Sequence, residues 1–177
     1  MAKILIAYAS MSGNTESIAD LIKVSLDAFD HEVVLQEMEG MDAEELLAYD
    51  GIILGSYTWG DGELPFEAED FHDDLENIDL SGKKVAVFGS GDTAYELFCE
   101  AVTIFEERLV ERGAELVQEG LKIELAPEDE EDVEKCSNFA IAFAEKFQEW
   151  ECQCGDNVKC DRYYKVKRWK AYVSYYI

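Results

Sequence analysis

The feature that most constrains the fold is a series of short apolar segments that alternate with segments of helical periodicity. The segments "KILIAY", "HEVVLQEM", "GIILGSY" and "KKVAVFGS" predict four strands, and a fifth is expected within "AELVQEGLKIEL". The third and fourth are almost continuously apolar, which is typical of strands that are buried on both faces. A sheet built from such strands needs helices on both sides.

The segments between the strands carry apolar side chains at α-helical spacing. One set follows the first strand and comprises Ile18, Leu21, Ile22, Leu26 and Phe29. A second set follows the fourth strand, before a natural helix end at Gly113, and comprises Leu97, Phe98, Ala101, Phe105 and Leu109. A third set follows the acidic "PEDEEDVE", whose charge suits a helix start, and comprises Val133, Cys136, Ala140, Phe143 and Phe147. This alternation predicts an α/β protein with a doubly wound, five-stranded parallel sheet of order 2-1-3-4-5 and helices on both faces.

The charge of the chain excludes several classes of partner. The sequence has 40 acidic and 15 basic residues, which gives a formal net charge of -25. A phosphate backbone or an anionic membrane surface would repel such a molecule, so we expect no nucleic acid and no membrane partner. The apolar runs are far shorter than the ~20 residues that cross a bilayer, and we find no signal peptide. Five cysteines, an odd number, do not suit an extracellular disulfide framework, so a cytoplasmic protein is expected.

In a doubly wound sheet, ligands bind beyond the carboxyl ends of the strands, near the point where the strand order reverses. Three loops of this chain lie at such ends, at residues 9–15, 58–65 and 90–95. The first contains "SMSGNT", which comprises Ser10, Met11, Ser12, Gly13, Asn14 and Thr15. Its hydroxyl and amide donors, at the start of a helix and without a lysine, suit one monophosphate. The alternative is an ordinary helix cap, because serine and asparagine are common caps.

The other two loops each present an aromatic ring. Trp59 lies in "YTWGDGELP", together with Thr58, Gly60 and Asp61. Tyr95 lies in "FGSGDTAYELF", which also contains Ser90, Gly91, Asp92 and Leu97. Taken alone, the second loop could be a turn that caps a helix at Asp92 or Thr93, with a tyrosine packed on the surface. A planar ligand with a single phosphate, held between Trp59 and Tyr95, would account for all three loops together.

With these three motifs in order, the sequence resembles the short-chain flavodoxins over residues 1–148. The resemblance implies a flavodoxin-like fold and a non-covalently bound FMN. It implies that residues 10–15 hold the phosphate and that Trp59 and Tyr95 enclose the flavin ring. Backbone around Asp92, Leu97 and Cys99 would bond its pyrimidine edge. The peptide between Gly60 and Asp61 would turn to accept the N5 proton of the semiquinone, and glycine permits that turn.

The same resemblance implies a low-potential, one-electron carrier, and therefore an electron-transport protein and not an enzyme. As a monomer it would shuttle electrons from a donor similar to flavodoxin/ferredoxin-NADP reductase to acceptor enzymes. Acids near the flavin loops would steer it to the basic faces of these redox proteins: Glu63, Glu67, Glu69 and Asp70. The alternative is an FMN-dependent quinone or NAD(P)H oxidoreductase of the same fold. Such an enzyme needs an open flavin face, whereas Trp59 and Tyr95 would cover both.

We find no sign of metal or nucleophilic chemistry in the first 148 residues. His31 and His72 lie on polar segments without partners, so surface positions are expected. Cys99 and Cys136 lie at core-like helix positions, where an inert buried thiol is the usual case.

Residues 149–177 differ in kind from the rest of the chain. They hold six basic and four acidic residues, three of the five cysteines and seven aromatic residues. The cysteines of "CQCGDNVKC" lack the paired spacing of a zinc site, so metal binding is disfavoured. The segment "YYKVKRWKAYVSYYI" could instead add to a sheet edge or contact a partner. The interpretation that we favour is a poorly ordered or non-native extension of the 1–148 domain.

Overall fold

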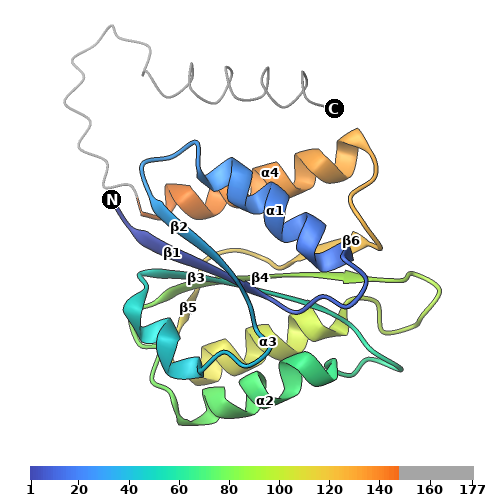
Figure 1. Ribbon diagram of the computed structural model, residues 1–177, viewed down its shortest axis with the longest axis horizontal. Coiled ribbons are helices and arrows are strands. Elements are labelled where there is room, and N and C mark those ends of the chain that lie inside the picture. Colours follow the sequence, from blue (N-terminus) through green and yellow to red (C-terminus); the bar gives the residue numbers. More distant parts are fainter. Residues whose placement is uncertain (148–177) are drawn as a thin grey trace, which may run out of the picture. The chain divides into compact units, whose positions relative to one another are not determined.

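The computed structural model describes residues 1–147, and the predictions made for residues 149–177 lie outside this range. Along the chain the elements are β1 (Lys3–Tyr8), α1 (Asn14–Leu26), β2 (Glu32–Glu37), the 3-10 helix η1 (Ala43–Ala48), β3 (Gly51–Tyr57), α2 (Phe66–Asp74), the 3-10 helix η2 (Leu75–Asn77), β4 (Lys84–Gly91), α3 (Glu100–Glu111), β5 (Glu115–Leu116), β6 (Leu121–Glu124) and α4 (Glu130–Glu145). All strand pairs are parallel, in the order β2-β1-β3-β4-β5. The doubly wound topology predicted from the sequence is therefore confirmed (Figure 1).

The expected fifth strand consists of two short strands that both pair with β4. Glu115 of β5 lies opposite Lys84, at the start of β4. Leu121 of β6 lies opposite Phe88, near its end. The edge of the sheet is thus continued along β4 by two segments, and β6 brings the chain to the carboxyl end where the candidate site lies.

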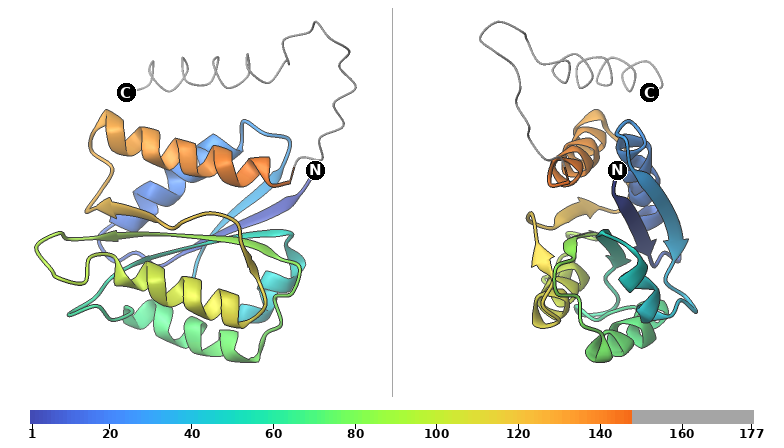
Figure 2. Two further views of the ribbon diagram at one scale, coloured as in Figure 1. Left: turned by 180° about the vertical axis from the view of Figure 1, so that it is seen from behind. Right: turned by 90° about the vertical axis from the view of Figure 1, so that its left-hand side faces the viewer.

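Each face of the sheet is covered by two α-helices, α1 and α4 on one side and α2 and α3 on the other (Figures 1 and 2). Side chains along β1 and β3 alternate between the two cores, because successive strand residues point to opposite faces. Leu5 and Ile52 pack with Phe71 and Phe105 in one core. In the other core the strand residues pack with side chains of α1 and α4: Ile4, Ile6, Ile53, Ile18, Ile22, Phe139 and Phe143. Burial on both faces explains the nearly continuous apolar runs of these strands.

The start of α3 differs from the sequence prediction. The helix begins at Glu100, and Cys99 precedes it with a left-handed φ of 53°. Leu97 and Phe98 share the helical spacing of the residues after them, but they belong to a turn that leads from β4 into the helix. Cys99 and Cys136 are both fully buried, as expected for inert thiols, and burial raises the pKa of each thiol to about 12.

The prediction that both histidines lie on the surface is wrong. His31 Nδ1 accepts a hydrogen bond from the Ala2 amide (3.3 Å), and its ring stacks on Phe29. The His72 side chain is only 14% exposed, and its Nε2 accepts a hydrogen bond from Arg108 Nε (3.3 Å). Burial lowers the pKa of both rings, and the Arg108 charge lowers that of His72 further. Tertiary contacts, which a polar local sequence does not reveal, provide these partners.

Within residues 1–147, none of the helices is long and apolar enough to span a lipid bilayer.

Candidate functional site

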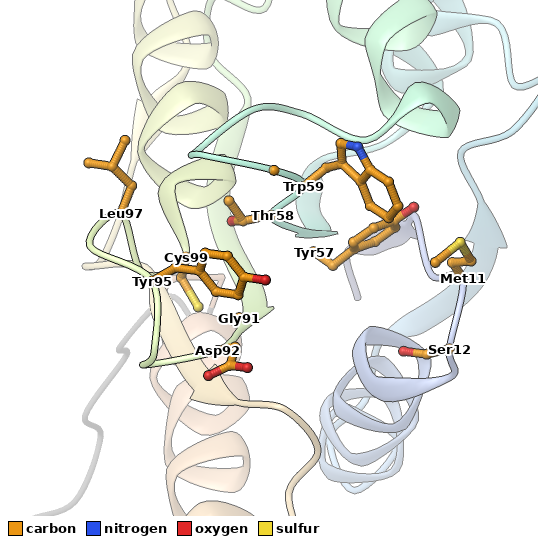
Figure 3. A pocket seen from close by; sticks show the side chains of 11 residues that line it. Met11, Ser12, Tyr57, Thr58, Trp59, Gly91, Asp92, Tyr95, Leu97 and Cys99 are labelled. Carbon is orange, nitrogen blue, oxygen red and sulfur yellow. The ribbon is translucent and has the colours of Figure 1, made fainter.

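A pocket of about 410 Å³ lies beyond the carboxyl ends of β1, β3 and β4 (Figure 3). The pocket is lined by Met11, Ser12, Tyr57, Thr58, Trp59, Gly60, Gly91, Asp92, Tyr95, Leu97 and Cys99. All of these residues except Tyr57 are site residues predicted from the sequence. The three loops chosen by the strand-end rule therefore meet at one cavity.

Six of the predicted site residues do not line this pocket: Ser10, Gly13, Asn14, Thr15, Asp61 and Ser90. Thr15 and Ser90 are buried behind it, where their hydroxyl oxygens lie 2.8 Å apart. This hydrogen bond connects the first turn of α1 to the end of β4. Asp61 is exposed at the tip of its turn. Ser10, Gly13 and Asn14 form the path from β1 into α1.

The residue at the N-cap of α1 has no side chain that could cap the helix. Gly13 is the N-cap residue, with φ 86°, and it forms no side-chain cap. Ser10 Oγ accepts hydrogen bonds from the amides of Gly13 (3.1 Å) and Glu16 (3.3 Å). The serine thus holds the loop in shape and caps the Glu16 amide of the first helical turn, while the N-cap residue itself, Gly13, has no side chain that could cap the helix.

One wall of the pocket is the turn that carries Trp59. Trp59 and Glu63 exchange two backbone hydrogen bonds of 2.9 Å each, which close a tight turn over residues 60–62. Thr58 Oγ1 accepts a hydrogen bond from the Ala101 amide (3.1 Å) and fixes the base of the turn to α3. The indole ring is nevertheless 52% exposed. Its backbone is held more firmly than its side chain.

The opposite wall is the turn that carries Tyr95. Asp92 Oδ1 accepts a hydrogen bond from the Ala94 amide (2.8 Å), and Asp92 O accepts one from the Tyr95 amide (3.1 Å). Asp92 therefore shapes a turn and caps no helix, since α3 begins only at Glu100. Tyr95 is 55% exposed, so about half of the side chain remains uncovered. Figure 3 shows Tyr95 and Trp59 on opposite sides of the pocket.

Tyr57 is the pocket residue that sequence reasoning missed. Its ring meets the Trp59 ring edge-on, with 6.4 Å between the centroids. Its hydroxyl donates a hydrogen bond to Glu67 Oε2 of α2 (2.9 Å). Burial, and then the Glu67 carboxylate, raise the pKa of Tyr57 to about 12. A signal was present in the sequence, because Tyr57 ends β3 at the edge of the sheet where ligands bind and lies two residues before Trp59.

The arrangement suits binding better than covalent chemistry. Cys99 is a potential nucleophile among the lining residues, but the high pKa of its thiol keeps it protonated near neutral pH. Two half-exposed rings on opposite walls, with a donor-rich loop and an open helix start beside them, match a flat ligand that carries one anionic group. Fold and site together define a doubly wound α/β protein whose pocket, at the carboxyl edge of its sheet, suits a planar, phosphorylated ligand.

Comparisons with known proteins identify the family. The family model described as flavodoxin matches residues 6–139. A protein of Bacillus subtilis described as probable flavodoxin 1 is 55% identical over 143 residues, which are 81% of this chain and 90% of the relative. The crystal structure of oxidised flavodoxin 2 from Bacillus cereus is 99% identical, with a TM-score of 0.82, and covers 82% of this chain and 100% of that one. Flavodoxin 1 of the same organism is 50% identical, with a TM-score of 0.80 and coverage of 82% and 99%. The chain belongs to the flavodoxin family.

Membership of this family settles the kind of function. The chain is an FMN-binding electron carrier and not an enzyme, and it transfers electrons to redox partners. The resemblance that the sequence motifs suggested is thereby confirmed. None of these findings favours the alternative of a quinone or NAD(P)H oxidoreductase.

Proposed function

We propose that this carrier holds FMN in the pocket between Trp59 and Tyr95. The observation that carries the proposal is the pair of half-exposed rings on facing walls. An aromatic side chain on a loop tip gives up much of its burial energy unless another surface covers it. A flavin ring between them would cover both. Bound FMN supplies the redox chemistry, since it accepts and returns single electrons.

The phosphate of FMN fits the loop of residues 10–15. Ser12 lines the pocket, and α1 begins next to it without a side-chain cap at Gly13. The amides of Asn14 and Thr15, in the first helical turn, have no intrahelical carbonyl to bond, and they lie at the positive end of the helix dipole. We propose that these amides and the Ser10 and Ser12 hydroxyls hold the phosphate. Thr15 contributes in addition by anchoring the helix start to Ser90.

The other end of the flavin fits the loop that precedes α3. Asp92, Leu97 and Cys99 line this end of the pocket, and Cys99 has a left-handed backbone that L-residues other than asparagine and aspartate rarely adopt. Such strain of about 1–3 kcal/mol persists only where the surroundings or a function require it. We propose that backbone groups around these three residues bond the polar edge of the ring. Gly60 has a left-handed φ of 52°, and as a glycine it would let the Gly60–Asp61 peptide turn toward the ring at little steric cost.

The negative charge of the chain lowers the reduction potential of the carrier and attracts basic partners. Because the net charge is -25, adding an electron to the bound ligand is disfavoured, so the potential of the carrier is low. Acids beside the pocket, among them Glu63 and Asp61, would attract basic faces of a reductase similar to flavodoxin/ferredoxin-NADP reductase and of acceptor enzymes. We propose that the protein works as a monomer in the cytoplasm.

The FMN site is tested by replacing each ring. Stacking on one aromatic side chain stabilises a bound base by about 1–3 kcal/mol, so Trp59→Ala and Tyr95→Ala should each weaken FMN binding by about 5- to 150-fold. The dissociation constant is measured by titrating FMN into the apoprotein and following the quenching of flavin fluorescence. Phe66→Ala is the matched control, because Phe66 is 79% exposed on α2 and lies outside the pocket lining. Equal FMN affinities for the parent protein and all three variants would refute the site.

The partner surface is tested separately. Glu69→Lys and Asp70→Lys reverse two exposed charges on α2. We expect slower reduction by a basic reductase at low ionic strength, a difference that added salt removes, and unchanged FMN affinity. A rate that does not respond to either charge or salt would contradict the steering role.

The division of the chain into a 1–148 FMN-binding domain and a 149–177 extension also stays a prediction. A chain that ends at Gln148 should retain both FMN affinity and resistance to urea. Loss of either would show that the extension contributes.

A further inference from the structure

We propose that Tyr57 and Glu67 form a positioning pair that fixes the orientation of the Trp59 indole in the FMN site. The proposal rests on the FMN site described above, and it assigns a role to two residues that do not themselves have to touch the ligand. The pair joins the last residue of β3 to the first turn of α2. Trp59 lies in the connection between these two elements.

The contacts form a short chain from α2 to the indole. Glu67 Oε2 accepts the Tyr57 hydroxyl at 2.9 Å, and the Tyr57 ring meets the Trp59 ring at an interplanar angle of 82°. Figure 3 shows the phenol of Tyr57 beside the indole, on the wall opposite Tyr95. An edge-to-face contact of this kind is directional, so the angle of one ring constrains the angle of the other.

Trp59 needs such support because little else holds its side chain. The hydrogen bonds that Trp59 makes with Gly62 and Glu63 join backbone atoms, and the indole is half exposed. A ring that is free to rotate in the apoprotein must lose that freedom when it stacks on a ligand, which weakens binding. Holding the ring in place beforehand removes part of this cost.

The position of Glu67 makes the hydrogen bond durable. Its carboxylate lies in the first turn of α2, where the helix dipole favours negative charge. The Tyr57 hydroxyl stays protonated at all physiological pH values, because its pKa is about 12. The donor therefore keeps the form that the bond requires. The phenol is held at both ends, by α2 at its hydroxyl and by β3 at its backbone.

Four variants test the pair in the full-length protein. Tyr57→Phe keeps the ring and removes the donor, and Glu67→Ala removes the acceptor. Each should weaken FMN binding about two- to tenfold, the range expected when one side chain must be immobilised on binding instead of being held beforehand. The double variant should be no weaker than either single variant, because both remove the same interaction. Glu67→Gln keeps a carbonyl acceptor and should restore affinity to within about twofold of the parent protein.

The control is Asp74→Ala, which removes a carboxylate from the other end of α2, where it caps nothing with its side chain. It separates loss of charge from loss of the hydrogen bond, and its affinity should equal that of the parent. Additive effects of the two single variants, or a Glu67→Gln variant as weak as Glu67→Ala, would overturn the positioning role. Unchanged affinity in Tyr57→Phe while Trp59→Ala binds weakly would refute this pair alone. Unchanged affinity in Trp59→Ala as well would refute the proposed FMN site itself.

Discussion

Gly62 is a position where one added methyl group should disturb the proposed FMN site. Its φ is 110°, a conformation that L-residues rarely adopt. A Cβ atom there would lie 2.5 Å from Leu97 Cδ1 and 3.0 Å from Leu97 Cβ. Rotation of the Leu97 side chain can move Cδ1 away, but Cβ is fixed to the backbone. Gly62→Ala must therefore push apart the two turns that carry Trp59 and Tyr95.

The size of the effect follows from two separate terms. Forcing alanine into this backbone conformation should cost about 1–3 kcal/mol of folding free energy. A gap of about 0.5–1 Å between stacked surfaces loses a quarter to a half of their dispersion energy. Because stacking on one ring contributes about 1–3 kcal/mol, about 0.3–1.5 kcal/mol is lost, and FMN should bind about 1.5- to 12-fold more weakly.

Two controls separate these terms. Gly82→Ala shares a positive φ of 81° but meets no atom within 4 Å, so it should lose stability in urea without losing FMN affinity. Gly62→Ala combined with Leu97→Gly should regain part of the lost affinity, since the contacts with both Leu97 Cδ1 and Leu97 Cβ are gone. FMN affinity is followed by flavin fluorescence and stability by urea denaturation. Parent-like affinity in Gly62→Ala would refute the argument that contact between these two turns sets the width of the pocket.

Three further outcomes are expected. Thr15→Val should lower the free energy of unfolding by about 1–3 kcal/mol, because it leaves the buried Ser90 hydroxyl without its partner, and Thr15→Ser should not; urea denaturation measures both. Folding lowers the pKa of His72 below its ordinary value of 6.5, so as the pH falls the unfolded chain binds a proton before the folded chain does. The protein therefore loses stability as the pH falls below about 6.5. His72→Gln should therefore lose less stability on acidification than the parent, and an equal loss would contradict this. Tyr57→Phe should remove the tyrosine that titrates near pH 12, which ultraviolet absorbance detects as one fewer high-pH phenol.

The parallel sheet could be predicted because its strands are buried on both faces. Side chains such as Ile4 and Leu5 point to opposite cores, and each must be apolar, so the pattern is visible without tertiary information. The start of α3 could not be predicted in the same way. Phe98 has the spacing of a helical residue, but its place is decided by the turn that brings β4 to Cys99. Local periodicity does not distinguish a helix from a turn that packs on the same core.

Part of the candidate site could likewise be predicted from the sequence, and part could not. Trp59 and Tyr95 stand out because large rings beside glycines need a cover, and the strand-end rule brings their loops together. The partnership of Tyr57 with Glu67 depends on the angle at which α2 leaves the turn, and no spacing in the sequence reports that angle. Likewise, the serine and threonine hydroxyls near the phosphate loop look alike in the sequence. Only the structure separates Ser12, which lines the pocket, from Thr15, which is buried against Ser90.

The measurement that tests the central claim most directly is a stepwise reduction of the purified protein with bound FMN, followed by its visible absorption spectrum. A one-electron carrier should take up two electrons in two separate one-electron steps, and the protein alone should oxidise NAD(P)H negligibly. Uptake of both electrons in one step, together with steady NAD(P)H oxidation, or a colourless protein that takes up no FMN, would contradict the account.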